Sequence, residues 1–230
     1  MAKKRLDVLL VERGLAESRA QAQALVLAGL VPGHEKAGEQ VDESAELTVT
    51  APPPYVSRGG EKLAHALDAF GVDPGGRDCL DVGYGQLHPR IRDDSRVTVL
   101  ERTNVREIRE LPFAPGLVVC DVSFVSVRKA LPPALALTAP GWEAVVLVKP
   151  QFEAGRREAP RGVVRDREVW RRVLREVAAE APSWGAQVAG VVDSGLPGPK
   201  GNREFFLHLV QRERPENPDE LEDWIDDATA

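Results

Sequence analysis

The sequence is poor in cysteine and has no long apolar run. It contains two cysteines in 230 residues, each inside a short strand-like apolar stretch, which favours free buried thiols in a reducing compartment. No apolar stretch approaches the roughly 20 residues that cross a bilayer. Acidic residues soon follow the basic start, which argues against a signal peptide. We therefore expect a cytoplasmic protein with no membrane partner.

Metal-binding patterns are also missing, because the four histidines are isolated from one another and from both cysteines. The net charge of -6 argues at first against a nucleic-acid partner, but the charge is unevenly distributed. Residues 215–230 hold seven of the 36 acidic residues and no lysine or arginine, which leaves 29 acidic residues against 30 basic ones elsewhere. This tail is expected to be a disordered or weakly helical solvated segment. Competition with RNA for a basic face is the alternative.

The N-terminal part reads as a small module of two short helices. Leucines from Leu6 onward have helical spacing, and Gly14 is expected to end that helix. Ser18 is a plausible N-cap of the second helix, which Gly29 would end. A strand is expected at 47–49.

Three consecutive prolines after Ala51 indicate a linker, since they cannot join a sheet ladder. The expected organisation is a head at residues 1–50, a linker at 51–58, a body at 59–214 and the acidic tail at 215–230.

In the body, apolar strand-like runs alternate with helical stretches. Strands are expected near 79–82, 97–100, 117–120, 144–148, 188–192 and 205–210. Helices are expected near 61–70, 127–137 and 167–181. This alternation predicts an α/β fold with a doubly wound parallel sheet. No helix separates the last two strands, so they should pair as an antiparallel edge.

Four charged residues lie far apart in the chain, each inside a recognisable motif. Lys62 belongs to a Ser-Arg-Gly-Gly-Glu-Lys-Leu stretch, Asp121 and Lys149 each end an apolar run, and Glu204 opens another. Charged residues at strand ends are where open α/β sheets keep their chemistry. One such residue is usually a solvated charge, but four in matching motifs are far more specific.

These motifs resemble the TlyA family of ribosomal RNA 2'-O-methyltransferases, whose catalytic domain is FtsJ-like. The resemblance implies a Rossmann-like methyltransferase sheet, S-adenosyl-L-methionine as cofactor, and ribosomal RNA or ribosomal subunits as partners. It also implies that Lys149 is the base and that Lys62, Asp121 and Glu204 support it. A lysine base needs a pKa well below about 10.4, and a second ammonium nearby lowers it, so we expect Lys62 to lie near Lys149.

The N-terminal helix pair resembles the α-L RNA-binding fold of a small-subunit ribosomal protein and of pseudouridine synthases. By that resemblance Arg5, Ser18 and Arg19 would face RNA phosphates, and we add Arg58 to the RNA-binding residues. The arginine-rich segment 155–166 resembles a substrate-side loop. An ordinary helix pair with solvated arginines remains the alternative for the head.

One stretch of the family pattern is missing. In that family a first strand leads into a glycine-rich loop that wraps the amino-acid end of the cofactor, and a second strand ends in an acidic residue that holds the ribose. Here two similar Asp-Val-Gly strings are fused near residue 82, as a deletion of roughly 20–30 residues, slightly less than a βαβ unit, would produce. The resemblance leaves Asp81, Gly83, Arg102, Thr103 and Asn104 for the cofactor.

The fusion leaves several hypotheses open. The chain could be an active enzyme with a tighter cofactor loop, a defective gene copy, or a catalytically impaired RNA-binding relic. Loss of a strand and its helix should leave Leu80, Val97 and Val99 with fewer apolar partners.

Overall fold

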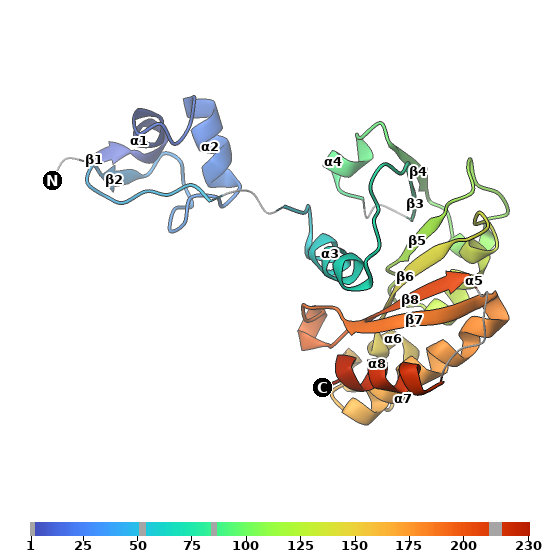
Figure 1. Ribbon diagram of the computed structural model, residues 1–230. Helices are drawn as coiled ribbons and strands as arrows, with labels where there is room; N and C mark the ends of the chain where they lie inside the picture. The colour runs from blue at the N-terminus through green and yellow to red at the C-terminus, as the bar shows by residue number, and fades with distance from the viewer. Residues whose placement is uncertain (1–2, 51–53, 84–86, 212–217) are drawn as a thin grey trace. The chain divides into compact units, whose positions relative to one another are not determined.

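The computed structural model describes residues 3–50, 54–83, 87–211 and 218–230. The chain divides into two compact units, Met1–Pro54 and Tyr55–Ala230. Most of the proline stretch in the expected linker, residues 51–53, lies outside the described residues. The two units, a head and a body, are described separately (Figure 1).

The head contains two helices and one small sheet. Its elements are β1 (Lys3–Arg5), α1 (Leu6–Glu12), α2 (Arg19–Leu27) and β2 (Gln40–Asp42), with β1 antiparallel to β2. Both helices are where the leucine spacing predicted them, and the Ser18 side chain accepts a hydrogen bond from Gln21 N as the N-cap of α2. The expected strand at 47–49 is wrong. Leu47 is buried in the head's core without strand pairing, because apolar character there reflects burial and not a ladder.

The body contains every strand and helix that the sequence predicted there. Its helices are α3 (Arg58–Phe70), α4 (Pro89–Arg92), α5 (Val127–Leu135), α6 (Pro150–Glu153), α7 (Arg167–Glu180) and α8 (Pro218–Ala228). Its strands are β3 (Cys79–Gly83), β4 (Val97–Glu101), β5 (Leu117–Cys120), β6 (Glu143–Val148), β7 (Ala186–Asp193) and β8 (Phe205–Gln211). Short 3₁₀ turns lie at Val105–Glu107, named η1, and at Pro160–Gly162, Ala181–Trp184 and Pro199–Gly201.

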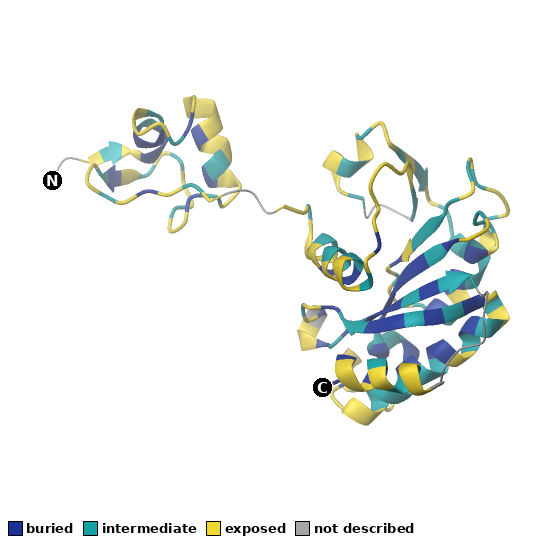
Figure 2. Ribbon diagram, viewed as in Figure 1, coloured by how far each residue is buried: buried dark blue, intermediate teal, exposed yellow. Residues whose placement is uncertain are grey.

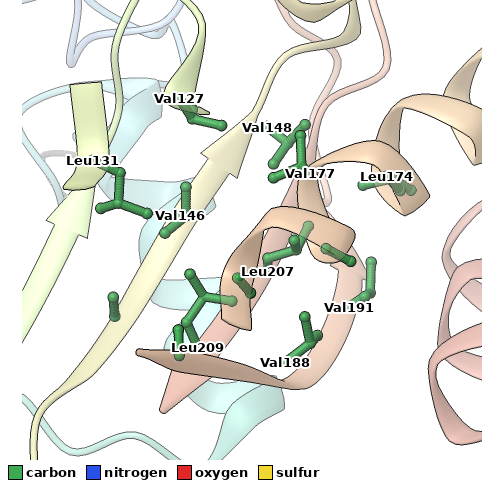
Figure 3. Packing of buried hydrophobic residues seen from close by; sticks show 14 of the residues in the cluster. Val127, Leu131, Val146, Val148, Leu174, Val177, Val188, Val191, Leu207 and Leu209 are labelled. Atoms are coloured by element: carbon green, nitrogen blue, oxygen red, sulfur yellow. The ribbon is translucent and has the colours of Figure 1, made fainter. Parts of the chain in front are cut away.

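A four-stranded sheet in the order β5-β6-β8-β7 is the centre of the body. β5 and β6 are parallel, and β8 is antiparallel to both β6 and β7, which confirms the predicted antiparallel edge. Alternate residues of β6 face opposite sides: Val146 and Val148 join the main core with α5, α7 and α8, whereas Val145 and Leu147 pack toward α3. Figure 3 shows Val146 and Val148 among side chains of the main core.

The sheet is interrupted on the side of β5. β3 and β4 form a separate two-stranded parallel sheet that makes no ladder with β5. Leu80, Val97 and Val99 are only half-buried, unlike the central strands of the main sheet (Figure 2). Val119 on β5 is 45% exposed. These four side chains lie where a further strand and its covering helix would be needed to complete one continuous sheet, which confirms the expected loss of burial.

The acidic tail is not the solvated segment that its charge predicted. Residues 218–228 form α8, whose Ile225 and Ala228 are buried in the main core, with Leu221 and Trp224 packed against it. These apolar residues recur at helical spacing, a signal that the charge count concealed. On the outer face Glu222 pairs with Arg175 on α7 at 2.7 Å, so the acidic residues face arginines of the body.

The two cysteines differ in environment. Cys79 on β3 is exposed, so the expectation of two buried thiols is wrong for that residue. Cys120 is buried, and burial, reinforced by the neighbouring Asp121 carboxylate, raises the pKa of the Cys120 thiol to about 12. Cys79 thus lies on the separate two-stranded sheet of β3 and β4, and Cys120 on the main sheet.

We predict that Ellman's reagent at pH 8 titrates one thiol per native chain, Cys79, because thiolates react and Cys120 is protonated and buried. The second thiol should react only in denaturant. Cys79→Ser should abolish the native reaction. An unreactive Cys79 in the folded protein would mean that β3 is covered.

Candidate active site

The sheet brings three of the four expected residues to one edge. Asp121 follows β5 and Lys149 follows β6, and these parallel strands end at the same edge. Glu204 directly precedes β8, which runs antiparallel to β6 with Phe205 opposite Val148, so its first residues lie at that edge too. Lys62 comes from α3, which packs on the sheet.

The first pair is a buried ion pair. Lys62 Nζ lies 2.6 Å from Glu204 Oε2, and the side chains are 8% and 2% exposed. Gly198 lies against the Glu204 carboxylate so closely that a β-carbon there would collide with it. The close backbone approach therefore depends on a glycine, and it helps to hold Glu204 in place.

The second pair is more open to solvent. Lys149 Nζ lies 2.6 Å from Asp121 Oδ1, with side-chain exposures of 11% for the lysine and 48% for the aspartate. The same ammonium donates to Ser123 Oγ at 3.0 Å. Each lysine thus contacts a carboxylate, and Lys149 is the one with a solvent-facing partner.

Gln151 is a further member of the site. Its Nε2 donates to Glu204 Oε1 at 2.9 Å, so both oxygens of that carboxylate are hydrogen-bonded within the protein. The amide oxygen Oε1 of Gln151 is buried and has no donor among the described residues. Turning the amide round would place two acceptors against each other, so the network fixes its orientation. A buried acceptor without a partner suits a hydroxyl or N–H group of a bound ligand.

Phe124 lies close to these residues, and no local sequence pattern pointed to it. Its φ is 64°, uncommon for a bulky residue, and it is 91% exposed. Its ring tilts against that of Phe152 at 5.1 Å, and Phe152 in turn lies 6.0 Å from Lys149 Nζ. An exposed aromatic ring beside the lysine is suited to stacking on a flat ligand.

The expected cofactor residues lie at the ends of β3 and β4. Asp81 is half-buried, and burial, with the Glu101 carboxylate nearby, raises its pKa. Thr103 Oγ1 donates to the Glu101 carbonyl at 3.1 Å. Asn104 caps η1 by accepting from Arg106 N at 3.2 Å. The polar turn after β4 is therefore shaped by its own hydrogen bonds.

The fit of these residues to S-adenosyl-L-methionine is partial. An acidic residue on β3 and the turn after β4, where Arg102 has a φ of 57°, suit the nucleoside half of the cofactor. The amino-acid half needs a glycine-rich turn that leads into a helix with free N–H groups. Gly83 ends β3, and the next described helix, α4, has four residues. The described residues therefore fit the nucleoside half only.

The expected RNA-binding residues are divided between the two units. In the head Arg5 and Arg19 both contact Asp7, and the Ser18 hydroxyl is engaged in the cap of α2. In the body Arg58 begins α3 and donates to the Pro197 carbonyl at 2.5 Å, beside the loop that contacts Glu204.

The arginine-rich segment 155–166 is tied to the loop before β8. Asn202 Oδ1 accepts from Val164 N at 3.0 Å and its Nδ2 donates to the Gly162 carbonyl at 2.9 Å. Arg161 and Arg165 are exposed on this segment.

Within the described residues no group of three or more His, Cys, Asp or Glu side chains could hold a metal ion. No helix among them is long and apolar enough to cross a membrane.

Comparisons with known families agree with both units. Residues 78–211 match the FtsJ-like methyltransferase family, and residues 4–31 match the S4 domain. The S4 match corresponds to the predicted RNA-binding head, and the FtsJ-like match contains Asp121, Lys149 and Glu204.

Individual relatives extend over nearly the whole chain. A Bacillus subtilis protein named "Putative rRNA methyltransferase YqxC" is 42% identical over 90% of this chain and 85% of its own length. The Mycobacterium tuberculosis 16S/23S rRNA (cytidine-2'-O)-methyltransferase TlyA is 40% identical over 96% of this chain and 95% of its own length. A solved structure, "Putative hemolysin from Streptococcus thermophilus", superposes with a TM-score of 0.69 at 34% identity, covering 98% of this chain and 95% of that one.

The alignment with the mycobacterial protein also bears on the interrupted sheet. It extends over 257 positions, whereas this chain has 230 residues, so at least 27 positions, the excess of the first number over the second, have no counterpart here. That shortfall is of the size of one strand with its helix and connections. The mycobacterial relative is 40% identical over nearly the whole of this chain, and the FtsJ-like family matches more than half of this chain. The chain therefore belongs to the TlyA family of FtsJ-like methyltransferases, with an S4 domain at its N-terminus.

Proposed function

We propose that this protein transfers a methyl group to ribose 2'-hydroxyls of ribosomal RNA. The observation that carries the proposal is the pair of Lys–carboxylate contacts, Lys62–Glu204 and Lys149–Asp121, at one edge of the sheet. The names of the relatives and the S4 domain point to the same substrate class. Such a substrate would place the protein in the cytoplasm, with the ribosomes.

In this proposal Lys149 first gives up its own proton to solvent, and its neutral amine then takes the proton from the 2'-hydroxyl and becomes an ammonium. A ribose hydroxyl is a poor acid, so its oxygen needs a base within hydrogen-bond reach during attack. Lys149 Nζ already has two oxygen partners, Asp121 and Ser123, one of which is half-exposed and can give way to a substrate oxygen. S-adenosyl-L-methionine, where it binds, supplies the methyl group.

Lys62, Glu204 and Gln151 orient the substrate. Both carboxylate oxygens of Glu204 already accept a hydrogen bond, one from Lys62 and the other from Gln151. The main role of Glu204 is therefore to hold these two side chains and not to bind the ligand. The unpartnered Gln151 Oε1 is the buried acceptor for a ribose hydroxyl. The exposed Phe124 ring would stack on the target base and hold it out of its RNA helix.

A second candidate is an RNA-binding protein without turnover, a relic of such an enzyme. The interrupted sheet and the four-residue α4 favour it, because the amino-acid half of the cofactor has no cradle among the described residues. The two candidates share the RNA-binding head and differ in methyl transfer.

Lys149→Ala should lower methyl transfer to ribosomal subunits by about 10²–10⁴-fold, the usual contribution of a general base. Binding of the subunits should be unchanged, because Lys149 is largely covered. The measurement is transfer of labelled methyl from S-adenosyl-L-methionine to purified 30S and 50S subunits, followed by digestion to nucleosides.

Lys129→Ala is the matched control, since Lys129 is an exposed lysine of the same body. It should retain the wild-type rate. Label on a base nitrogen, or full activity in Lys149→Ala, would sink the proposed function. Subunit binding by the wild type without any transfer would establish the second candidate.

Gly198→Ala should reduce the same transfer rate by about 10²-fold, the penalty for small displacements of catalytic groups. The added β-carbon collides with the Glu204 carboxylate and shifts it from Lys62 and Gln151. Gly116→Ala is the control, because its β-carbon would lie 3.7 Å from the nearest atom. Unchanged activity in Gly198→Ala would mean that the position of Glu204 does not matter.

A further inference from the structure

A single buried carboxylate in the head holds two arginines. Asp7 on the first turn of α1 is fully buried. It accepts from Arg5 Nε and Nη2, both at 3.0 Å, from Arg19 Nη2 at 2.9 Å and from Gln23 Nε2 at 3.1 Å. One carboxylate on α1 thus fixes side chains from the end of β1 and from α2.

The arginines themselves remain accessible. Their side chains are 45% and 57% exposed, whereas that of Asp7 is 0% exposed. Arg5 Nη1 and the Nε and Nη1 groups of Arg19 donate to no acceptor among the described residues. Gly38 supports the Arg5 guanidinium from one side, since a β-carbon there would lie 3.2 Å from both Nη atoms. The buried side of each guanidinium is occupied and the outer side is free.

The charges also favour an anionic ligand. Two guanidinium groups share one carboxylate, so an excess of one positive charge remains at the surface. The hydrogen bonds from Arg5, followed by those from Gln23 and Arg19, hold the pKa of Asp7 well below its usual range. The anchor therefore stays ionised at neutral pH, and the remaining N–H donors of the two fixed guanidinium groups can donate to the oxygens of a phosphate.

We propose that Asp7 is a positioning residue that presets Arg5 and Arg19 to bind one backbone phosphate of RNA. This inference rests on the proposed ribosomal RNA substrate. For the RNA affinity of a variant without the Asp7 charge, this inference predicts the opposite of what the net charge alone predicts. Removing the buried negative charge should tighten RNA binding if only net charge matters, and should weaken it if the fixed orientation of the arginines matters.

The test is binding of the full chain to purified ribosomal RNA at several salt concentrations, without cofactor. Asp7→Asn should bind about 10-fold more weakly than the wild type, although its net charge is one unit more positive. The slope of log affinity against log salt should fall by about 0.9, the value for one lost phosphate contact. Glu35→Gln, an exposed residue of the head with the same charge change, should bind as tightly as the wild type or more tightly.

A purely structural role of Asp7 is separated by a second variant. Arg5→Lys keeps the charge but cannot offer the planar fork of two nitrogens that Arg5 presents to the two oxygens of Asp7, and it should weaken binding by a similar factor. The double variant Asp7→Asn/Arg5→Lys should bind no more weakly than either single variant, because both remove the same preset geometry. The proposal is overturned if the losses of RNA affinity in the two single variants add up in the double variant. It is also overturned if the loss of affinity parallels a loss of head folding measured by circular dichroism. If Asp7→Asn does not fold, Arg5→Lys with wild-type affinity overturns it as well.

Failure of this inference and failure of the proposed function are distinguishable. Equal RNA affinity of Asp7→Asn and the wild type, with methyl transfer intact, rejects the role of Asp7 and leaves the function standing. Asp7-dependent binding without methyl transfer rejects the function and supports the role of Asp7. Absence of RNA binding by the wild type rejects both.

Discussion

The buried contact between Lys62 and Glu204 is the interaction on which the site depends. The two residues are 142 positions apart, one on α3 and the other directly before β8, and their side chains meet at 2.6 Å. Breaking a buried ion pair by removing one partner typically destabilises a protein by about 3–5 kcal/mol. Together with the apolar contacts that Ala66 of α3 makes, this pair fixes the helix on the sheet. The position of Gln151, and so the shape of the ligand site, follows from the same carboxylate.

The interrupted sheet and the intact edge have different consequences for function. Asp121, Lys149 and Glu204 are placed by β5, β6 and β8. These strands pair with one another, β5 with β6 and β6 with β8, and need no pairing with β3 or β4. The residues proposed to take part in proton transfer therefore lie at one edge of this sheet. The interruption of the sheet leaves β5 without a neighbour on one side, where Val119 is exposed.

The sequence was sufficient for most of the body, because each strand there is an apolar run that local pattern alone reveals. Asp121, Lys149 and Glu204 could be singled out from their place at strand ends, and Lys62 from the motif around it. A weakly helical tail was one of the expectations, but its packing on the core was missed because charge dominates its composition, although Ile225 is buried. Phe124 and Gly198 could not be found, since a positive φ and a contact with Glu204 arise only in the folded chain. The exposure of Cys79 was missed because its apolar neighbours imply a covered strand.

We propose that this chain keeps the groups for proton transfer and the nucleoside half of the cofactor site, and that its described residues offer no cradle for the amino-acid half. Calorimetric titration with S-adenosyl-L-methionine and with adenosine, which has no amino-acid part, tests it most directly. We expect the dissociation constants of S-adenosyl-L-methionine and of adenosine to differ by less than about 10-fold, or about 1.4 kcal/mol. Micromolar binding of S-adenosyl-L-methionine that is 100-fold or more tighter than that of adenosine would contradict it, and would show that the chain holds the amino-acid half after all.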